Sequence, residues 1–196
     1  VGQSGTRHAA NAAAYQPFHG ERWTSKAVMP TARGEFAAAA YNGKIYVFGG
    51  SAGGGPLNAA ESYDPVTNAW TSLASLPTAR SNSAAANVGG KIYVVGGTSN
   101  LGATSLDVNE EYDPETNAWA AAKVSMSVPR SHLSVVAGGS SLYAFGGLLN
   151  TADSAVNERY VPASDAWTSA ASFPSAPGRS RMAAASAAGP LAGIIF

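Results

Sequence analysis

The stretch "GKIYVFGG" at residues 43–50 decides the fold, because the chain repeats it. It returns as "GKIYVVGG" at 90–97 and as "SLYAFGG" at 141–147. A second motif follows each copy, as "ESYDPVTNAW" at 61–70, "EEYDPETNAW" at 110–119 and "ERYVPASDAW" at 158–167. Self-similarity at a fixed period is typical of repeat architectures, so the sequence predicts three copies of one structural unit.

Each copy predicts four short strands. An Ala/Val-rich run leads through a glycine turn into a "KIYVF" strand, whose β-branched and aromatic residues favour β structure. A variable loop, a strand ending in Tyr, a "DPVTN" or "DPETN" turn and a strand beginning at Trp complete the unit. No segment has helical periodicity, so we expect an all-β domain.

This unit, with a double glycine, a Tyr and a Trp in fixed order, resembles the kelch repeat, one blade of a β-propeller. The resemblance covers almost the whole chain. It implies structural roles, in which the glycines permit a tight bend and the aromatic residues pack between neighbouring blades. The residues concerned are Gly49, Gly50, Tyr63, Trp70, Gly96, Gly97, Tyr112, Trp119, Gly146, Gly147, Tyr160, Trp167, Tyr15 and Trp23.

The two ends of the chain predict a fourth unit that is split. "YQPFHGERW" at 15–23 is a degenerate copy of "YDPVTNAW", and "RSRMAAASAAG" at 179–189 repeats the spacing from Arg33 to Gly43. "PLAGIIF" then replaces "KIYVF" with two residues inserted. We therefore expect one kelch-type propeller domain over 1–196, with four blades of four antiparallel strands, closed by a blade shared between the termini. The expected blades cover approximately residues 31–76, 77–127, 128–173, and 174–196 plus 1–30.

Kelch propellers usually have more than four blades, which leaves an alternative open. In that alternative the four units are a fragment, or half, of a larger ring with six to eight blades. The closed ring favours a monomer, whereas the alternative allows two chains to complete a larger ring.

Composition narrows the classes of partner. The chain has 12 basic and 12 acidic residues among 196, so its formal charge is zero and neither nucleic acid nor an anionic membrane is expected as a partner. No cysteine is present, and the three histidines match no metal-binding spacing, so neither a metal nor another cofactor is expected. No segment has the length of a transmembrane helix, and neither a membrane-spanning helix nor a cleavable signal is expected. The compartment stays unknown.

The resemblance also implies where a ligand would be met. Kelch propellers that capture peptides use two loops per blade, one after the double glycine and one after the Arg that precedes the inner strand. The second residue after that Arg is polar and different in each unit, namely Glu35, Asn82, His132 and Arg181. The loops after the double glycines add Gln3, Ser51, Thr98, Asn100 and Asn150. An alternative role for Glu35 and Arg181 is a simple ion pair between adjacent blades, with His132 hydrogen-bonded locally.

The leading hypothesis is a non-catalytic scaffold that binds a protein or peptide through this face. Copper-radical sugar oxidases of similar fold need a Tyr cross-linked to Cys, which is excluded here. Iron-dependent specifier proteins need more clustered Asp, Glu and His residues than Glu35 and His132 provide. The alternative is a sugar-processing enzyme of the sialic-acid mutarotase type, with Glu35 and His132 or Arg181 as acid and base, or a carbohydrate-binding propeller.

Two further charged positions recur. An Arg precedes the inner strand in every unit, at Arg33, Arg80, Arg130 and Arg179, and a Glu precedes the Tyr at Glu61, Glu110 and Glu158, with Ala13 in the split unit. Recurrence in every blade favours a structural role over a catalytic one.

Overall fold

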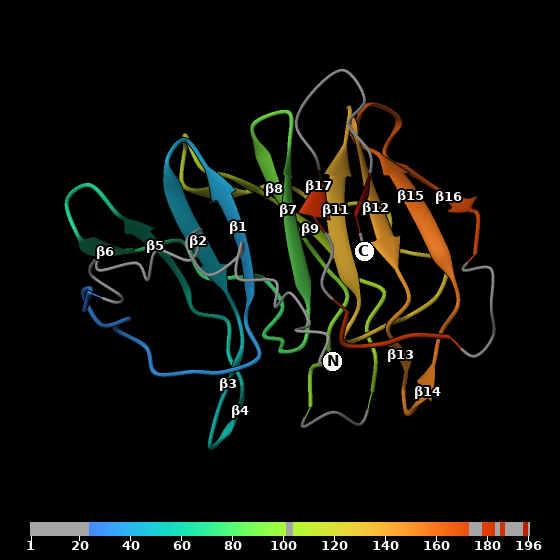
Figure 1. Ribbon diagram of the computed structural model, residues 1–196, viewed down its shortest axis with the longest axis horizontal. Helices are drawn as coiled ribbons and strands as arrows, with labels where there is room; N and C mark the ends of the chain where they lie inside the picture. Colours follow the sequence, from blue (N-terminus) through green and yellow to red (C-terminus); the bar gives the residue numbers. More distant parts are fainter. Residues whose placement is uncertain (1–23, 101–103, 173–177, 183–184, 187–193, 196) are drawn as a thin grey trace, which may run out of the picture.

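The computed structural model describes residues 24–100, 104–172, 178–182, 185–186 and 194–195. Three four-stranded antiparallel sheets lie side by side as blades (Figure 1). The chain is all-β as expected, and the one helical element of the described part is a 3-10 turn at Pro162–Ser164.

Each blade keeps the strand order that the repeat predicts, from an inner strand to an outer one. The first blade comprises β1 (Ala37–Tyr41), β2 (Lys44–Phe48), β5 (Ala60–Asp64) and β6 (Ala69–Ser72). The second comprises β7 (Ala84–Val88), β8 (Lys91–Val95), β9 (Asn109–Asp113) and β10 (Ala118–Trp119). The third comprises β11 (Ser134–Gly138), β12 (Ser141–Phe145), β15 (Asn157–Val161) and β16 (Ala166–Ala170).

Short hairpins occupy two of the loops after the double glycines. They are β3 (Ser51–Ala52) with β4 (Gly55–Pro56), and β13 (Leu148–Leu149) with β14 (Ala152–Asp153). Both project at the same end of the blades (Figure 1).

The fourth unit is described only in part. β17 (Ala185–Ser186) pairs antiparallel with β18 (Ile194–Ile195), as expected for the inner strands of the split blade. Ala185 lies opposite Ile195, whereas two inserted residues would place it opposite Ile194, so the connection is one residue longer than predicted. The predicted outer strands, with Tyr15 and Trp23, lie outside the described residues, and the closed ring stays a prediction.

The core consists of the layers between neighbouring blades. The Phe48 ring lies 5.4 Å from the Tyr112 ring and 5.6 Å from the Trp119 ring, which joins the first blade to the second. In the next layer the rings of Tyr93 and Tyr160 lie 5.5 Å apart. The second and third blades therefore each use the face with Tyr and Trp to pack against the blade before them.

The double glycine is needed where a following unit approaches closely. Gly96 has φ 64°, and a side chain there would collide with the carbonyl of Arg130. The neighbouring Gly97 N–H donates to that same carbonyl at 2.9 Å. Glycine adopts positive φ without a steric penalty, so it allows both the bend and the contact between units.

The turn before each Trp holds the chain that arrives from the preceding unit. Asn117 Oδ1 accepts hydrogen bonds from the Tyr112 hydroxyl at 2.7 Å and from the Ala74 N–H at 2.8 Å. Trp119 Nε1 donates to the Ala74 carbonyl at 2.9 Å. We call this arrangement the clasp. The same bonds recur with Tyr63, Asn68 and Trp70 on Ala27, and with Tyr160, Asp165 and Trp167 on Val124.

Candidate functional site

The arginines that precede the inner strands form ion pairs inside the three complete blades. Arg33 pairs with Glu61 at 2.8 Å and Arg130 with Glu158 at 2.6 Å, and Arg80 pairs with Glu110 in the same way. All three guanidinium side chains are fully buried. We call Arg33, Arg80 and Arg130 the buried arginines.

In the second and third blades the arginine also bonds the double-glycine turn beside the inner strand. Arg130 Nη1 donates to the carbonyls of Gly146 at 2.8 Å and Val156 at 2.7 Å. Burial lowers the pKa of Arg130, and the carboxylate of Glu158 acts against that shift. Because these arginine side chains are fully buried, they do not form part of an exposed ligand-binding surface.

Two residues after each arginine, the backbone enters the left-handed region. The φ angles are 56° at Glu35, 54° at Asn82, 52° at His132 and 53° at Arg181. For residues with a side chain this conformation costs about 1–2 kcal/mol. It persists in four units whose side chains all differ, so the surrounding structure must impose it.

Backbone hydrogen bonds between units impose this conformation. The Asn82 N–H donates to the Glu35 carbonyl at 2.8 Å, and the His132 N–H donates to the Asn82 carbonyl at 2.8 Å. The Arg181 N–H donates to the His132 carbonyl at 2.9 Å. We call this series the ladder. The ladder fixes the position of one residue of each unit along the inner edge of the blades.

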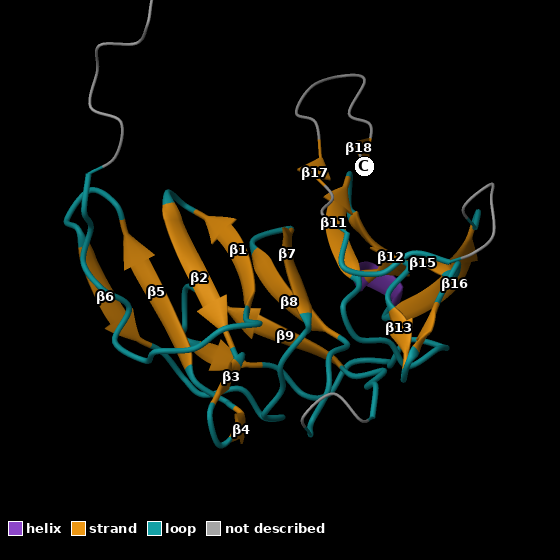
Figure 2. Cartoon of the chain, turned by 60° about the horizontal axis from the view of Figure 1, so that its bottom comes forward, coloured by secondary structure: helices purple, strands orange, loops and turns teal. Residues whose placement is uncertain are grey.

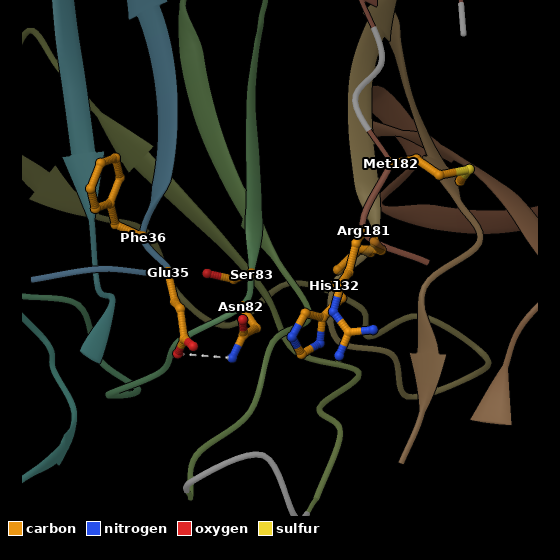
Figure 3. Close-up of a pocket in the computed structure, with 8 residues that line it drawn as sticks. Glu35, Phe36, Asn82, Ser83, His132, Arg181 and Met182 are labelled. Carbon is orange, nitrogen blue, oxygen red and sulfur yellow. Dashed lines mark hydrogen bonds between the residues drawn. The ribbon is translucent and has the colours of Figure 1, made fainter. Parts of the chain in front are cut away.

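The four ladder side chains line a single open pocket of about 240 Å³ (Figure 3). The residue that follows each of them lines it too, which adds Phe36, Ser83, Leu133 and Met182. These four residues were not predicted from the sequence. Three of them, Phe36, Leu133 and Met182, are large and apolar at the same position of the repeat. This recurrence in the sequence could have indicated an apolar wall beside the polar residues. The pocket thus combines charged groups with an apolar wall.

Glu35 is held toward its neighbour in the ladder. Its Oε2 accepts hydrogen bonds from Ser51 Oγ at 2.9 Å and from Asn82 Nδ2 at 3.2 Å. The expected ion pair between Glu35 and Arg181 is not among those that the described residues form. Asn82 and His132 stand between them, so the carboxylate and the guanidinium occupy opposite ends of the row (Figure 3).

His132 makes the local contact that the alternative predicted. Its Nδ1 lies 3.1 Å from Ser131 Oγ. Partial burial lowers the pKa of His132, the charge of Arg181 lowers it further, and Glu35 acts in the opposite direction. The imidazole is therefore mainly neutral at pH 7, with one ring nitrogen that donates and one that accepts.

The loops after the double glycines contribute less than predicted. Thr98 is buried and bonds the Asn100 carbonyl, so its side chain does not reach the face. Asn150 bonds the loop of the preceding unit instead, since its Oδ1 accepts from the Ser105 N–H at 3.3 Å and its own N–H donates to Ser105 Oγ at 2.9 Å. Asn100 Oδ1 accepts from the Thr104 N–H at 3.0 Å. Ser51 contacts a pocket residue, because its Oγ donates to Glu35, and Gln3 lies outside the described residues.

Within the described ranges, no group of three or more His, Asp or Glu side chains is placed to hold a metal ion. The same residues include no helix with the length and apolar character needed to span a membrane.

Two kelch family models match this chain. The family model of the KLHDC2/KLHL20/DRC7 Kelch-repeats domain matches residues 13–147, and the Kelch motif model matches residues 129–174. No curated protein matches the chain. A solved structure titled "Structure of YjhT" is similar with 20% identity and a TM-score of 0.73, over 84% of this chain. The chain spans 59% of the length of that structure, and the likeness concerns the fold alone.

Proposed function

The chain belongs to the kelch-repeat family, and from this premise we propose that it is a non-catalytic scaffold that binds a protein or peptide. The binding site is the pocket lined by Glu35, Asn82, His132 and Arg181. The ladder is the observation that supports this proposal, because it holds four different polar side chains at one open surface in a strained backbone conformation.

The arrangement suits an extended segment better than a compact ligand. The polar groups form a row with a carboxylate at one end and a guanidinium at the other (Figure 3). A peptide lying along the row would place a basic group near Glu35 and an acidic group near Arg181. Phe36 and Leu133 would contact its apolar side chains. A repeated backbone that carries variable side chains is how repeat proteins achieve specificity.

The test begins with peptides selected from a displayed library on the wild-type chain. The affinity of the best peptide is then measured by fluorescence anisotropy for wild type and for the variant Glu35→Ala, His132→Ala, Arg181→Ala. Removal of several central contacts should weaken binding by about 30-fold or more. The variant should keep its circular dichroism spectrum and melting behaviour.

A matched control removes one cation and one anion elsewhere. Lys26 and Glu115 are exposed and lie outside the pocket, so Lys26→Ala with Glu115→Ala should bind the peptide as wild type does. Equal affinity of all three proteins would show that the assigned pocket is not the binding site.

A sugar-processing enzyme is the second candidate, and one observation favours it. Glu35 and the mainly neutral His132 line the same pocket and could exchange protons with a bound sugar. Proton spectra of freshly dissolved sugars, recorded with and without the protein, measure the rate of anomer exchange. Faster exchange that is lost in Glu35→Gln would establish the enzyme, whereas unchanged exchange excludes it.

A further inference from the structure

The second blade has the shortest outer strand of the three complete blades. β10 pairs with β9 only over Ala118–Trp119, and one further bond joins the Ala120 N–H to the Glu111 carbonyl. In the third blade, by contrast, β16 follows β15 as far as the pair of Asn157 with Ala170. Figure 2 shows β6 and β16 along the outer sides of β5 and β15. The chain of the second blade therefore leaves its sheet earlier than in the other two.

The sequence gives a reason for this early departure. Leu76 and Met126 correspond to each other, because each donates its N–H to the loop that precedes the third strand of its blade. Leu76 follows Trp70 by six residues, whereas Met126 follows Trp119 by seven. The additional residue of the second blade lengthens the connection, so the chain bows away from β9.

A cavity of about 330 Å³ lies beside the first residues of β9, where no outer strand pairs. We call it the outer pocket. It shares no lining residue with the pocket that the ladder residues line. Its walls are apolar at Pro77, Val108, Ala120 and Ala122, and polar at Thr78, Asn109, Glu110, Lys123 and Ser125.

The carboxylate of Glu110 lacks a donor that its counterparts have. In the first blade Thr31 Oγ1 donates to Glu61 Oε1 at 2.8 Å, and the third blade has a bond of the same kind. Glu110 pairs with Arg80 through Oε2, but no described residue donates to its Oε1. Its side chain is only 9% exposed. An acceptor in such a buried position stays unpaired at a cost in free energy, which a ligand with a donor would relieve.

Two further groups of the outer pocket lack partners within the described part of the chain. Thr78 has the position of the Thr that bonds the carboxylate in the first blade, but its own hydroxyl forms no hydrogen bond there. The Ala60 carbonyl accepts the Leu73 N–H at 2.9 Å, whereas the equivalent Asn109 carbonyl accepts no such bond. The outer pocket thus has two acceptors, Glu110 Oε1 and the Asn109 carbonyl, and one hydroxyl that can donate.

We propose that the outer pocket binds a small molecule that carries a primary carboxamide on a compact apolar body. A primary carboxamide has two N–H donors and one carbonyl acceptor on a single planar group. These match the two acceptors and the Thr78 hydroxyl. Arg80 neutralises Glu110, and Lys123 pairs with Glu111 at 3.0 Å, so the pocket favours a neutral ligand. The aliphatic walls contact its apolar body.

Two probes of similar shape test the carboxamide. Benzamide has the two N–H donors, and methyl benzoate has none. In titrations followed by two-dimensional NMR, benzamide should shift the backbone amide signals of Asn109, Glu110 and Ala122, with a dissociation constant of roughly 1 mM. Methyl benzoate should bind at least about tenfold more weakly, because it leaves both acceptors unpaired. Equal affinities of the two probes would overturn the assignment of a carboxamide.

A pair of matched variants tests the pocket itself. Ala122→Leu places a larger side chain in the outer pocket and should abolish the shifts. Ala170→Leu is the control, because Ala170 has the equivalent position in the third blade, opposite Asn157, and this variant should bind benzamide as wild type does. Circular dichroism checks that both variants are folded. Shifts that persist in Ala122→Leu, or a wild-type spectrum unchanged at about 10 mM benzamide, would overturn the proposal.

Discussion

Arg130 and His132 are only two residues apart, yet their surroundings differ in every respect. Arg130 is fully buried, paired with Glu158, and has a counterpart with the same partner in each complete blade. His132 lines an open pocket, and the residue at its position differs in every unit. Repetition of a side chain within the chain therefore marks the bonds that build a blade. A backbone conformation that recurs while its side chain changes indicates a surface whose binding specificity can vary.

The largest effect should follow from breaking a buried ion pair. Glu158→Ala leaves the Arg130 guanidinium buried without its carboxylate, which should lower the free energy of unfolding by about 3–5 kcal/mol. Urea denaturation measures the change. Glu35→Ala removes an exposed acid two residues after Arg33 and should change the same quantity by less than about 0.5 kcal/mol. Similar losses of unfolding free energy in the two variants would show that the ion pairs of the buried arginines matter no more for stability than the ladder side chains.

A smaller effect should separate two asparagines with the same backbone conformation. Asn117 and Asn82 have φ of 52° and 54°. Asn117→Gly removes the acceptor of the Tyr112 hydroxyl and the Ala74 N–H, which should cost about 1–2 kcal/mol. Asn82→Gly loses only partly exposed bonds, and glycine tolerates this conformation, so its unfolding free energy should stay within about 0.5 kcal/mol of wild type. Thermal melts of both variants measure the two losses of stability. A larger loss in Asn82→Gly than in Asn117→Gly would contradict this prediction.

The smallest effect concerns the protonation of His132. Arg181→Ala should raise the pKa of His132 and Glu35→Ala should lower it, which NMR titration of the imidazole measures. Because the folded pKa lies below the ordinary value of 6.5, His132 contributes stability above that value. This contribution is lost as the pH falls through the folded pKa, and His132→Gln should remove it. Movement of the pKa in the same direction in both alanine variants would show that the two charges do not act on this ring.

The blades were predictable because their information is local. The strands, the glycine turns and the "DPETN" turn each depend on a few adjacent residues, and threefold repetition makes the pattern stand out from chance. In the second and third blades the Tyr and Trp pack against the preceding blade, as the resemblance implies. Glu35, Asn82, His132 and Arg181 were singled out by their position after the arginine, and the structure brings them together in one pocket.

The missed features depend on contacts between units. Arg and Glu were both recognised as recurrent, but nothing in the sequence states that Arg130 reaches Glu158 across 28 residues. The ladder was invisible because its bonds join backbone groups, which no side chain reveals. The ion pair expected between Glu35 and Arg181 presumed a closed ring of four. Burial of Thr98 depends on its pairing with Ser81 and Ser105, and the β17–β18 connection carries an insertion that the other units lack, so they do not fix its length.

The clasp has a consequence for how such a chain can lengthen. Each one joins a turn to the linker that directly precedes its own blade, so no blade depends on a distant unit for these bonds. A duplicated unit inserted between two blades would bring its own Tyr, its own Asn or Asp and its own Trp, and would find a linker to hold. Ancestral duplications could therefore add whole blades one at a time, each stabilised from its first appearance by its nearest neighbours.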